Sequence, residues 1–276
     1  MEKTLQEKVY DSIKLILRAR RVAYSLNYET GFIVAFSGGK DSQCVLELCR
    51  MAGVKYKAYY SVTGIDAPAN VHFIQKHYPE VEFLHPKENY FQLVEKKGLP
   101  MIQYRYCCER LKERVGLGSC LLDGVRAEES KKRSEYSSVM VRSRRKENVE
   151  RGRERDIAEI EEQQHRCIHG HDRLDIHPIL EWSKEDVWQF INERGIPVNP
   201  CYDLVERVGC MYCPFAQSRQ LDVYDKLYPS YKRRLLLALE RFLEVKSIEG
   251  IESAEEYYEW WKSKMTLKQW AQRKML

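Results

Sequence analysis

The stretch FIVAFSGGKDS, residues 32–42, decides how this chain folds. Its first five residues are all apolar, which is the pattern of a strand buried on both faces of a sheet. Two adjacent glycines follow, and a helical pattern of apolar residues begins just beyond them. A tight turn at a helix start exposes backbone N–H groups that stabilise an anion. The stretch therefore predicts a phosphate-binding loop on an α/β sheet.

The residue types of the loop suit this chemistry. The glycines let the backbone approach an anion closely, the serines offer hydroxyl groups, and the lysine supplies a cation. The spacing differs from that of a Walker loop, which needs four residues before its Gly-Lys pair, and from that of a dinucleotide fingerprint. A turn that served geometry alone would not require Lys-Asp-Ser at the helix start. The expected nucleotide-binding residues are Ser37, Gly38, Gly39, Lys40, Asp41 and Ser42.

Outward from the loop, short apolar runs alternate with helical patterns. Strands are expected at residues 32–36, 56–62, 81–84 and 119–125, and helices up to 26 and at 69–78 and 90–96. This alternation predicts an α/β fold in which helices flank a mostly parallel, Rossmann-like sheet. Further helices are expected at 184–193, 221–227, 230–245, 255–262 and 266–274. We expect an N-terminal helix at 1–28, a nucleotide-binding domain at 29–215 with a basic insert at 131–172, and a helical extension at 216–276.

Composition excludes several classes of protein. The 276 residues carry 46 Lys and Arg against 41 Asp and Glu, and a net charge of +5 is too mild to indicate a nucleic-acid partner. Aromatic residues make up 11% of the chain, which excludes low-complexity disorder. No apolar run is long enough to span a membrane, and the first eight residues are too charged to begin a signal peptide. We expect a soluble cytoplasmic protein that does not bind membranes.

The nine cysteines then become informative, because a reducing compartment argues against a disulfide framework. Cys44 and Cys49 fall on an apolar helical face and Cys120 lies in an apolar run, so we interpret these three as core residues. The others lie near Gly, Pro, Arg and aromatic residues, where thiols bind metal or do chemistry. They are Cys107, Cys108, Cys167, Cys201, Cys210 and Cys213.

Further motifs follow the loop in order. They are VTGIDAP (62–68) with Phe73-Ile74, RYCCERLK (105–112), DGVRAEES (123–130) with Arg133, and HPILEW (177–182) with DVW (186–188). With the loop and the cysteines up to Cys213, they resemble the phosphoadenylyl-sulfate (PAPS) reductase family, within the PP-loop adenine-nucleotide α-hydrolase-like superfamily. One departure is Val62, where the family usually has Asp, so a polar contact near the nucleotide is absent or comes from another residue.

The resemblance implies an adenine nucleotide at the loop: ATP, PAPS or adenylyl-sulfate (APS). Mg²⁺ would normally accompany ATP. It also implies that Lys40 and Arg126 are catalytic, since both could stabilise developing phosphate charge. The further nucleotide-binding residues that it implies are Thr63, Gly64, Gly124, Arg126, Ser130 and Arg133.

The tandem Cys107-Cys108 and the pair Cys210 and Cys213 resemble the cluster ligands of adenylyl-sulfate reductases and of DNA phosphorothioation ATP pyrophosphatases, which hold [4Fe–4S]. Four thiolates suit zinc as well, so the residues alone leave the metal open. Cys201 could replace one of the tandem pair. A second group is spaced two residues apart and is interpreted as a solvated loop without metal: His165, Cys167, His169 and His171.

Residues 131–155 carry ten Lys and Arg against four Glu, a net charge of +6. Part of this segment, from Arg142 to Arg155, could be a solvated helix stabilised by the pair Glu147 and Arg151. Alternatively it is an arm that contacts the phosphates of DNA or RNA without reading their sequence.

The reaction suggested by the resemblance is that of an AMP-forming ATP pyrophosphatase linked to sulfur transfer. A sulfur-donor protein or a thioredoxin-like reductant is then an expected partner. The alternatives are a thiol-dependent reductase of PAPS or APS, and a catalytically silent module that binds a nucleotide or nucleic acid. The family's reductases carry a nucleophilic cysteine in a Glu-Cys-Gly-Leu-His tail, and no cysteine follows Cys213 here, which favours the first hypothesis.

Overall fold

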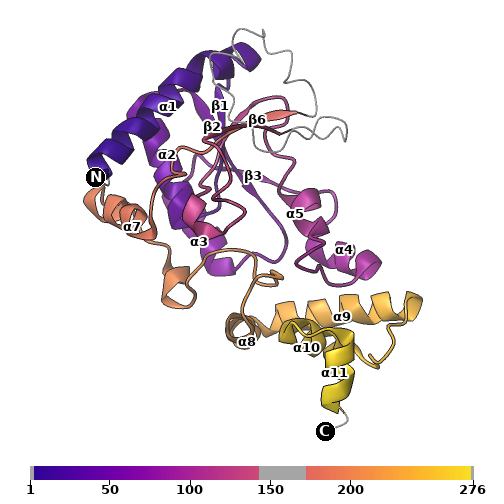
Figure 1. Cartoon of the computed structure of the whole chain (residues 1–276). Coiled ribbons are helices and arrows are strands. Elements are labelled where there is room, and N and C mark those ends of the chain that lie inside the picture. The colour runs from indigo at the N-terminus through magenta and orange to yellow at the C-terminus, as the bar shows by residue number, and fades with distance from the viewer. Residues whose placement is uncertain (1–2, 143–171, 275–276) are drawn as a thin grey trace. The chain divides into compact units, whose positions relative to one another are not determined.

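The computed structural model describes residues 3–142 and 172–274 (Figure 1). The second Cys/His group, at 165–171, and the basic residues between positions 143 and 155 lie outside these ranges. Contacts divide the chain into two compact units. The first is built from Met1–Ser61, Ala69–Leu84 and Arg114–Tyr202, and the second from Val62–Pro68, His85–Glu113 and Asp203–Leu276.

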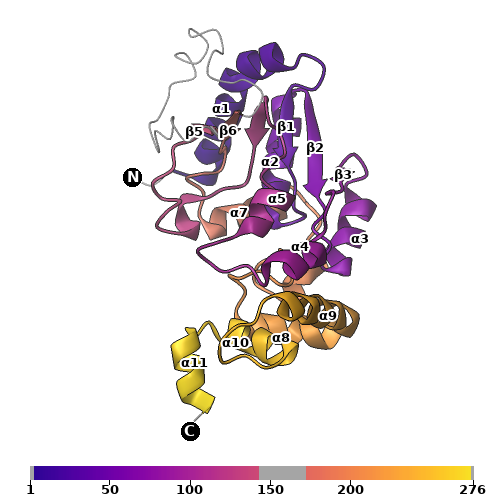
Figure 2. The same ribbon diagram turned by 90° about the vertical axis from the view of Figure 1, so that its right-hand side faces the viewer.

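The first unit is built on a six-stranded sheet with the strand order β3-β2-β1-β4-β6-β5. Its strands are β1 (Phe32–Ala35), β2 (Tyr56–Ser61), β3 (Glu82–Leu84), β4 (Cys120–Leu122), β5 (Val139–Arg142) and β6 (Arg173–Ile176). All neighbours are parallel except β5, which runs antiparallel to β6 at the edge (Figure 2). The expected α/β fold with a mostly parallel sheet is confirmed.

The central strands are apolar because helices cover them. The helices of this unit are α1 (Leu5–Leu26), α2 (Lys40–Ala52), α3 (Pro68–His77) and α7 (Lys184–Glu193). Thr4 begins α1 with a reciprocal capping bond to Glu7, and α1 packs on α2, which packs on α7 (Figure 1). Cys44, Cys49 and Cys120 are fully buried, as expected for core residues.

Two strands were not expected from the sequence. In β6 the guanidinium of Arg173 donates to the carboxylate of Asp175, and both side chains are buried. Their polarity hides the strand from a search for apolar runs. Arg142 ends β5 and donates to Asp175 at 2.8 Å. The interpretation that Arg142 lies on a solvated helix is therefore wrong, because an ion pair with a buried acid fixes it on a strand.

The second unit is helical. It contains α4 (Tyr90–Lys97), α5 (Tyr106–Leu111), α8 (Ser218–Leu227), α9 (Pro229–Val245), α10 (Ala254–Ser263) and α11 (Leu267–Lys274). Helix α9 packs on α4, α8 and α10, and the buried aromatic face of α10 includes Tyr258 and Trp261. Among the described helices of both units, none is long and apolar enough to cross a membrane.

Candidate nucleotide-binding site and cysteine cluster

The loop between β1 and α2 begins at the carboxyl end of a central strand, where a parallel sheet places its ligands. Gly38 has φ +75°, a left-handed conformation that favours glycine. A Cβ at this position would stand 2.3 Å from Oδ1 of Asn70 and 2.9 Å from Cδ1 of Ile74. Glycine at 38 is therefore required both by backbone conformation and by packing.

Two buried asparagines hold the carbonyl groups of this loop. Nδ2 of Asn199 donates to the carbonyl oxygen of Gly38 at 2.8 Å and to Oδ1 of Asn70 at 2.6 Å. Nδ2 of Asn70 donates to the carbonyl oxygen of Ser37 at 3.2 Å. Asn199 has no exposed surface and Asn70 retains 4%. We call these two residues the asparagine clamp. Their side-chain amides hold the carbonyl oxygens of Ser37 and Gly38 in place by hydrogen bonds.

The N–H groups of the loop are left partly unused. The N–H of Ser37 donates to Oγ of Ser42 at 3.1 Å, and that of Lys40 donates to the hydroxyl of Tyr202 at 2.8 Å. Within the described residues, no hydrogen bond is made by the N–H groups of Gly38, Asp41 or Ser42. Unpaired donors at the first turn of a helix favour an anion.

Two cations meet on one carboxylate beside these donors. Nζ of Lys40 donates to Oδ2 of Asp41 at 2.8 Å, and Nε of Arg126 donates to Oδ1 of the same residue at 2.7 Å. Nη1 of Arg126 donates to Glu128 at 2.6 Å, whereas its Nη2 makes no hydrogen bond within the described part of the chain. The guanidinium is buried and oriented, and it keeps one nitrogen for another acceptor.

The segment after β4 packs against the same loop. A Cβ on Gly124 would stand 2.8 Å from the backbone carbon of Asp41, so only glycine allows this approach. Further along, the side chain of Arg133 donates to Glu129, and the N–H of Arg133 donates to Oγ of Ser130. The loop, Gly124 and Arg126 are thus brought together, while the side chains of Ser130 and Arg133 bond within their own turn.

Thr63 and Gly64 belong to the second unit, where their segment pairs with the cysteine motif. Asp66 forms an antiparallel bridge with Cys210, and the N–H of Met211 donates to the carbonyl of Ile65 at 2.9 Å. The thiol of Cys210 donates to Oγ1 of Thr63 at 3.7 Å. In this unit the threonine expected at the nucleotide contacts a candidate metal ligand.

The four expected metal ligands are half-buried in the second unit. Cys107 and Cys108 lie in the first turn of α5, and Cys107 interacts electrostatically with Cys108, Cys210 and Cys213. A hydrogen bond from the Cys107 thiol lowers the pKa of Cys108 to about 6, with help from the nearby cations of Lys112 and Arg105.

Burial raises the pKa of Cys210, although the hydrogen-bonded ammonium of Lys112 opposes that effect. Over residues 3–142 and 172–274, no three His, Cys, Asp or Glu side chains form a group that could hold one metal ion. The donor set itself, four thiols in one electrostatic neighbourhood, is that of a sulfur-preferring metal or cluster. Cys201 lies in the first unit, buried, with its N–H donating to Oδ1 of Asn199 at 2.9 Å.

Sequence reasoning missed the asparagine clamp and Tyr202. A single asparagine between Val198 and Pro200 has no periodic signal, and its partner Gly38 is 161 residues away. It also missed the pairing of His177 with Asp123, although both stood in motifs quoted for the resemblance. For this pair the available signal was that Asp123 and His177 come directly after the strands β4 and β6.

The sequence profile of the phosphoadenosine phosphosulfate reductase domain matches residues 31–216, which include both the loop and the cysteines. This chain belongs to that family. The match ends three residues after Cys213, so the helices α8 to α11 of this reductase-family protein lie beyond it.

Two uncharacterized proteins of Methanocaldococcus jannaschii are similar in sequence. MJ0973 is 26% identical over 84% of this chain and 52% of its own length. MJ0066 is 27% identical over 80% of this chain and 48% of its own length. The family member described here thus spans about half the length of these relatives.

Three solved structures match this chain at low sequence identity and low TM-score. PAPS reductase from Candida auris superposes with a TM-score of 0.45 and 15% identity, over 76% of this chain and 97% of that one. The U34-tRNA thiolase NcsA from Methanococcus maripaludis, solved with its [4Fe–4S] cluster, superposes with a TM-score of 0.43 and 16% identity. The match covers 88% of this chain and 86% of NcsA. NMN synthetase from Francisella tularensis superposes with a TM-score of 0.37 and 13% identity, over 95% of this chain and 94% of the synthetase.

Proposed function

We propose that this chain is an ATP pyrophosphatase that activates an acceptor as its adenylyl ester and links this step to sulfur transfer. The observation that carries the proposal is the set of donors at the start of α2. Among the described residues, the N–H groups of Gly38, Asp41 and Ser42 and Nη2 of Arg126 are unpaired, and beside them Nζ of Lys40 and Nε of Arg126 donate to Asp41. Such an arrangement suits the closely spaced charges of a polyphosphate.

The proposed reaction has two steps. An oxygen of the acceptor attacks the α-phosphorus of ATP, and the bond to the bridging oxygen breaks, so that pyrophosphate leaves with the electron pair. A sulfur nucleophile from a donor then attacks the activated carbon of the acceptor, and AMP leaves. Lys40 and Arg126 stabilise the charge that develops on the phosphate oxygens, and the unpaired N–H groups orient the chain of phosphates. Mg²⁺ normally accompanies the triphosphate.

The thiols that the structure describes in the first unit support this reading over thiol-dependent reduction at the loop. Burial raises the pKa of Cys44, Cys49 and Cys120 well above the ordinary thiol value, so these groups remain protonated and unreactive at neutral pH. Cys201 is buried as well. A phosphate-activating site needs no thiolate of its own.

In the second unit, Cys107, Cys108, Cys210 and Cys213 would hold a [4Fe–4S] cluster, with zinc as the alternative. A cluster there would supply a site that binds sulfur or transfers electrons. The surrounding residues hold these cysteines in place whether or not a cluster is bound. The bridge with Asp66 and the hydrogen bond to Thr63 fix Cys210, and the ammonium of Lys112 offsets negative charge on the sulfurs.

The test is to incubate anaerobically purified protein with ATP, APS and PAPS separately. We expect pyrophosphate and AMP from ATP, and no sulfite from APS or PAPS. Lys40→Ala should abolish turnover and leave the far-ultraviolet circular dichroism native, whereas Lys57→Ala, on the exposed face of β2, should change neither. Sulfite release would identify a reductase instead. Unchanged turnover by Lys40→Ala would refute the loop as the site.

A further inference from the structure

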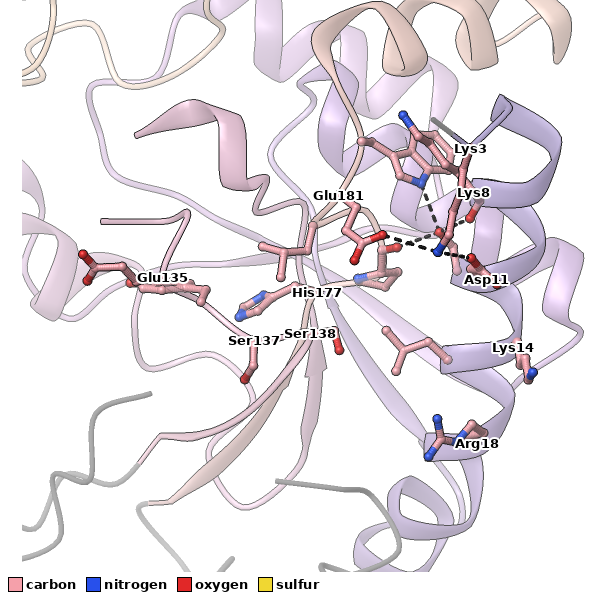
Figure 3. A pocket seen from close by; sticks show the side chains of 16 residues that line it. Lys3, Lys8, Asp11, Lys14, Arg18, Glu135, Ser137, Ser138, His177 and Glu181 are labelled. Atoms are coloured by element: carbon pink, nitrogen blue, oxygen red, sulfur yellow. Dashed lines mark hydrogen bonds and ion pairs between the residues drawn. The ribbon is translucent and has the colours of Figure 1, made fainter. Parts of the chain in front are cut away.

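A pocket of about 570 Å³ lies in the first unit, beside α1 (Figure 3). Helix α1 forms one wall and residues 135–138 form another, with His177 and Pro178 between them. None of residues 37–42 lines it, so it is distinct from the phosphate loop. Its volume is in the range of sites that take small molecules.

A buried histidine in this pocket has an unused nitrogen. The His177 side chain is 1% exposed, and its Nδ1 lies 2.7 Å from Oδ1 of Asp123. Its Nε2 is buried and makes no hydrogen bond within the described residues. The ionised carboxylate of Asp123 can only accept, so Nδ1 carries a proton, and in the imidazole tautomer with its proton on Nδ1 the other nitrogen is an acceptor. A buried acceptor without a donor is unfavourable, and a ligand hydroxyl would satisfy it.

The charges on the α1 wall indicate the rest of the ligand. Lys3 is paired with Asp11 at 2.8 Å and with Glu181 at 3.7 Å, and Lys8 is paired with Asp186 at 2.6 Å. In contrast, the exposed Lys14 has no ion pair among the described residues. Arg18 lies one turn further along the same wall (Figure 3). Two cations one turn apart suit a phosphate group.

Apolar surface completes the pocket. The ring of Tyr136 stacks on His177 at 5.7 Å between centroids, and Leu15 and Pro178 also line the space. Glu135 also lines the pocket on the side opposite α1, with its carboxylate directed away from His177 (Figure 3). Aromatic and aliphatic surfaces beside a hydroxyl acceptor suit the carbon face of a sugar ring.

We propose that this pocket binds a sugar phosphate, with a sugar hydroxyl donating to Nε2 of His177 and the phosphate held by Lys14 and Arg18. The same chemistry is offered by a free sugar phosphate and by a ribose with its phosphate in an RNA strand. The site requires no bound adenine nucleotide, so it stands or falls separately from the function proposed above.

The test uses the full chain labelled with ¹⁵N-histidine and ribose 5-phosphate as the probe. Binding should move the Nε2 resonance of one histidine, identified as His177 because the resonance is missing from His177→Asn. Isothermal titration should show that Lys14→Ala weakens binding about five- to tenfold. The matched control Arg20→Ala, an exposed change on α1 outside the pocket, should not, and neither should Lys40→Ala.

Two comparisons decide the chemistry and the source. Ribose and inorganic phosphate should each bind at least tenfold more weakly than ribose 5-phosphate, and equal binding of inorganic phosphate would overturn the hydroxyl contact. Competition by a short RNA but not by the matching DNA would identify RNA as the source of the ribose phosphate, and no competition by either would identify a free sugar phosphate. If millimolar ribose 5-phosphate leaves every histidine resonance in place, the proposal is wrong. Because Lys14 is exposed, its variant tests the site even if His177→Asn does not fold.

Discussion

The asparagine clamp makes a specific prediction about the phosphate loop. Asn199→Asp keeps the size of the side chain but replaces the Nδ2 donor with an oxygen. That oxygen would face the carbonyl oxygen of Gly38 and Oδ1 of Asn70, at the positions now joined by hydrogen bonds of 2.8 and 2.6 Å. The remaining oxygen can still accept from the N–H of Cys201. The substitution therefore removes two donated bonds and, when the new side chain is ionised, places a buried negative charge beside two acceptor oxygens.

The magnitude follows from these contacts. A hydrogen bond contributes about 1–1.5 kcal/mol net, so the loss of two should lower the free energy of unfolding by at least about 2–3 kcal/mol, and the buried charge adds to this loss. Without its donor, the Gly38 carbonyl is free to rotate toward the anion site and displace an N–H that faces phosphate. Losing one N–H contact to a charged oxygen costs about 1.5–3 kcal/mol, which corresponds to a 10- to 150-fold weaker affinity for ATP.

The assay pairs chemical denaturation with equilibrium binding of ATP. Asn192→Asp is the matched control, since Asn192 is exposed near the end of α7 and introduces the same charge away from the loop. We expect both losses in Asn199→Asp and neither in the control. A variant that loses stability yet binds ATP like the parent would show that the clamp supports the fold without orienting the loop, and the reasoning would be refuted.

Three further predictions concern other parts of the molecule. Gly124→Ala should reduce ATP turnover more than tenfold while the protein stays folded, because its Cβ would stand 2.8 Å from the backbone of Asp41; turnover and circular dichroism measured together would check this, and parental turnover would contradict it. Anaerobically purified protein should be brown, with about four irons and matching sulfide per chain. Cys210→Ser should remove the colour and Cys44→Ser should not, whereas colourless protein with stoichiometric zinc would contradict the iron assignment. Finally, burial raises the pKa of Asp123, but the pairing with His177 and the hydrogen bond from the N–H of Val125 outweigh burial and leave that pKa below its usual value. The carboxylate therefore stabilises the fold above the unfolded pKa of about 3.9 and loses this effect as the pH falls further. The unfolding free energy of Asp123→Asn should accordingly depend less on pH below 5 than that of the parent, and equal slopes would count against the pair.

The sequence predicted the sheet and most of its helices because their residues repeat with clear periods. Residues 32–36 are wholly apolar, and the structure places β1 in the centre of the sheet. The strand β6 escaped because two of its four residues, Arg173 and Asp175, satisfy each other's charge inside the sheet. Composition records polarity, whereas burial depends on whether a polar group finds a partner.

The candidate site was predictable to the same degree. Local signals, such as adjacent glycines before Lys40, marked the residues that would face a ligand. The groups that hold those residues in place, Asn70, Asn199 and Tyr202, come from distant parts of the chain and bind backbone atoms. Backbone atoms are the same at every residue, so such contacts leave no mark on the sequence of the loop that they support.

The antiparallel pair of β5 and β6 at the edge of the sheet bears on which residues can change without affecting the fold. Arg142 and Arg173 are register partners at the ends of β5 and β6, so the two residues that flank the 30 residues 143–172 are adjacent in the sheet. Replacing them with a four-residue turn would change the loop-closure entropy by only about 2 kcal/mol, in favour of the fold. We therefore expect that substitution of the basic residues in this stretch leaves the sheet unaltered. Substitutions between β5 and β6 could therefore change the net charge of the protein while the sequence of the phosphate loop is kept.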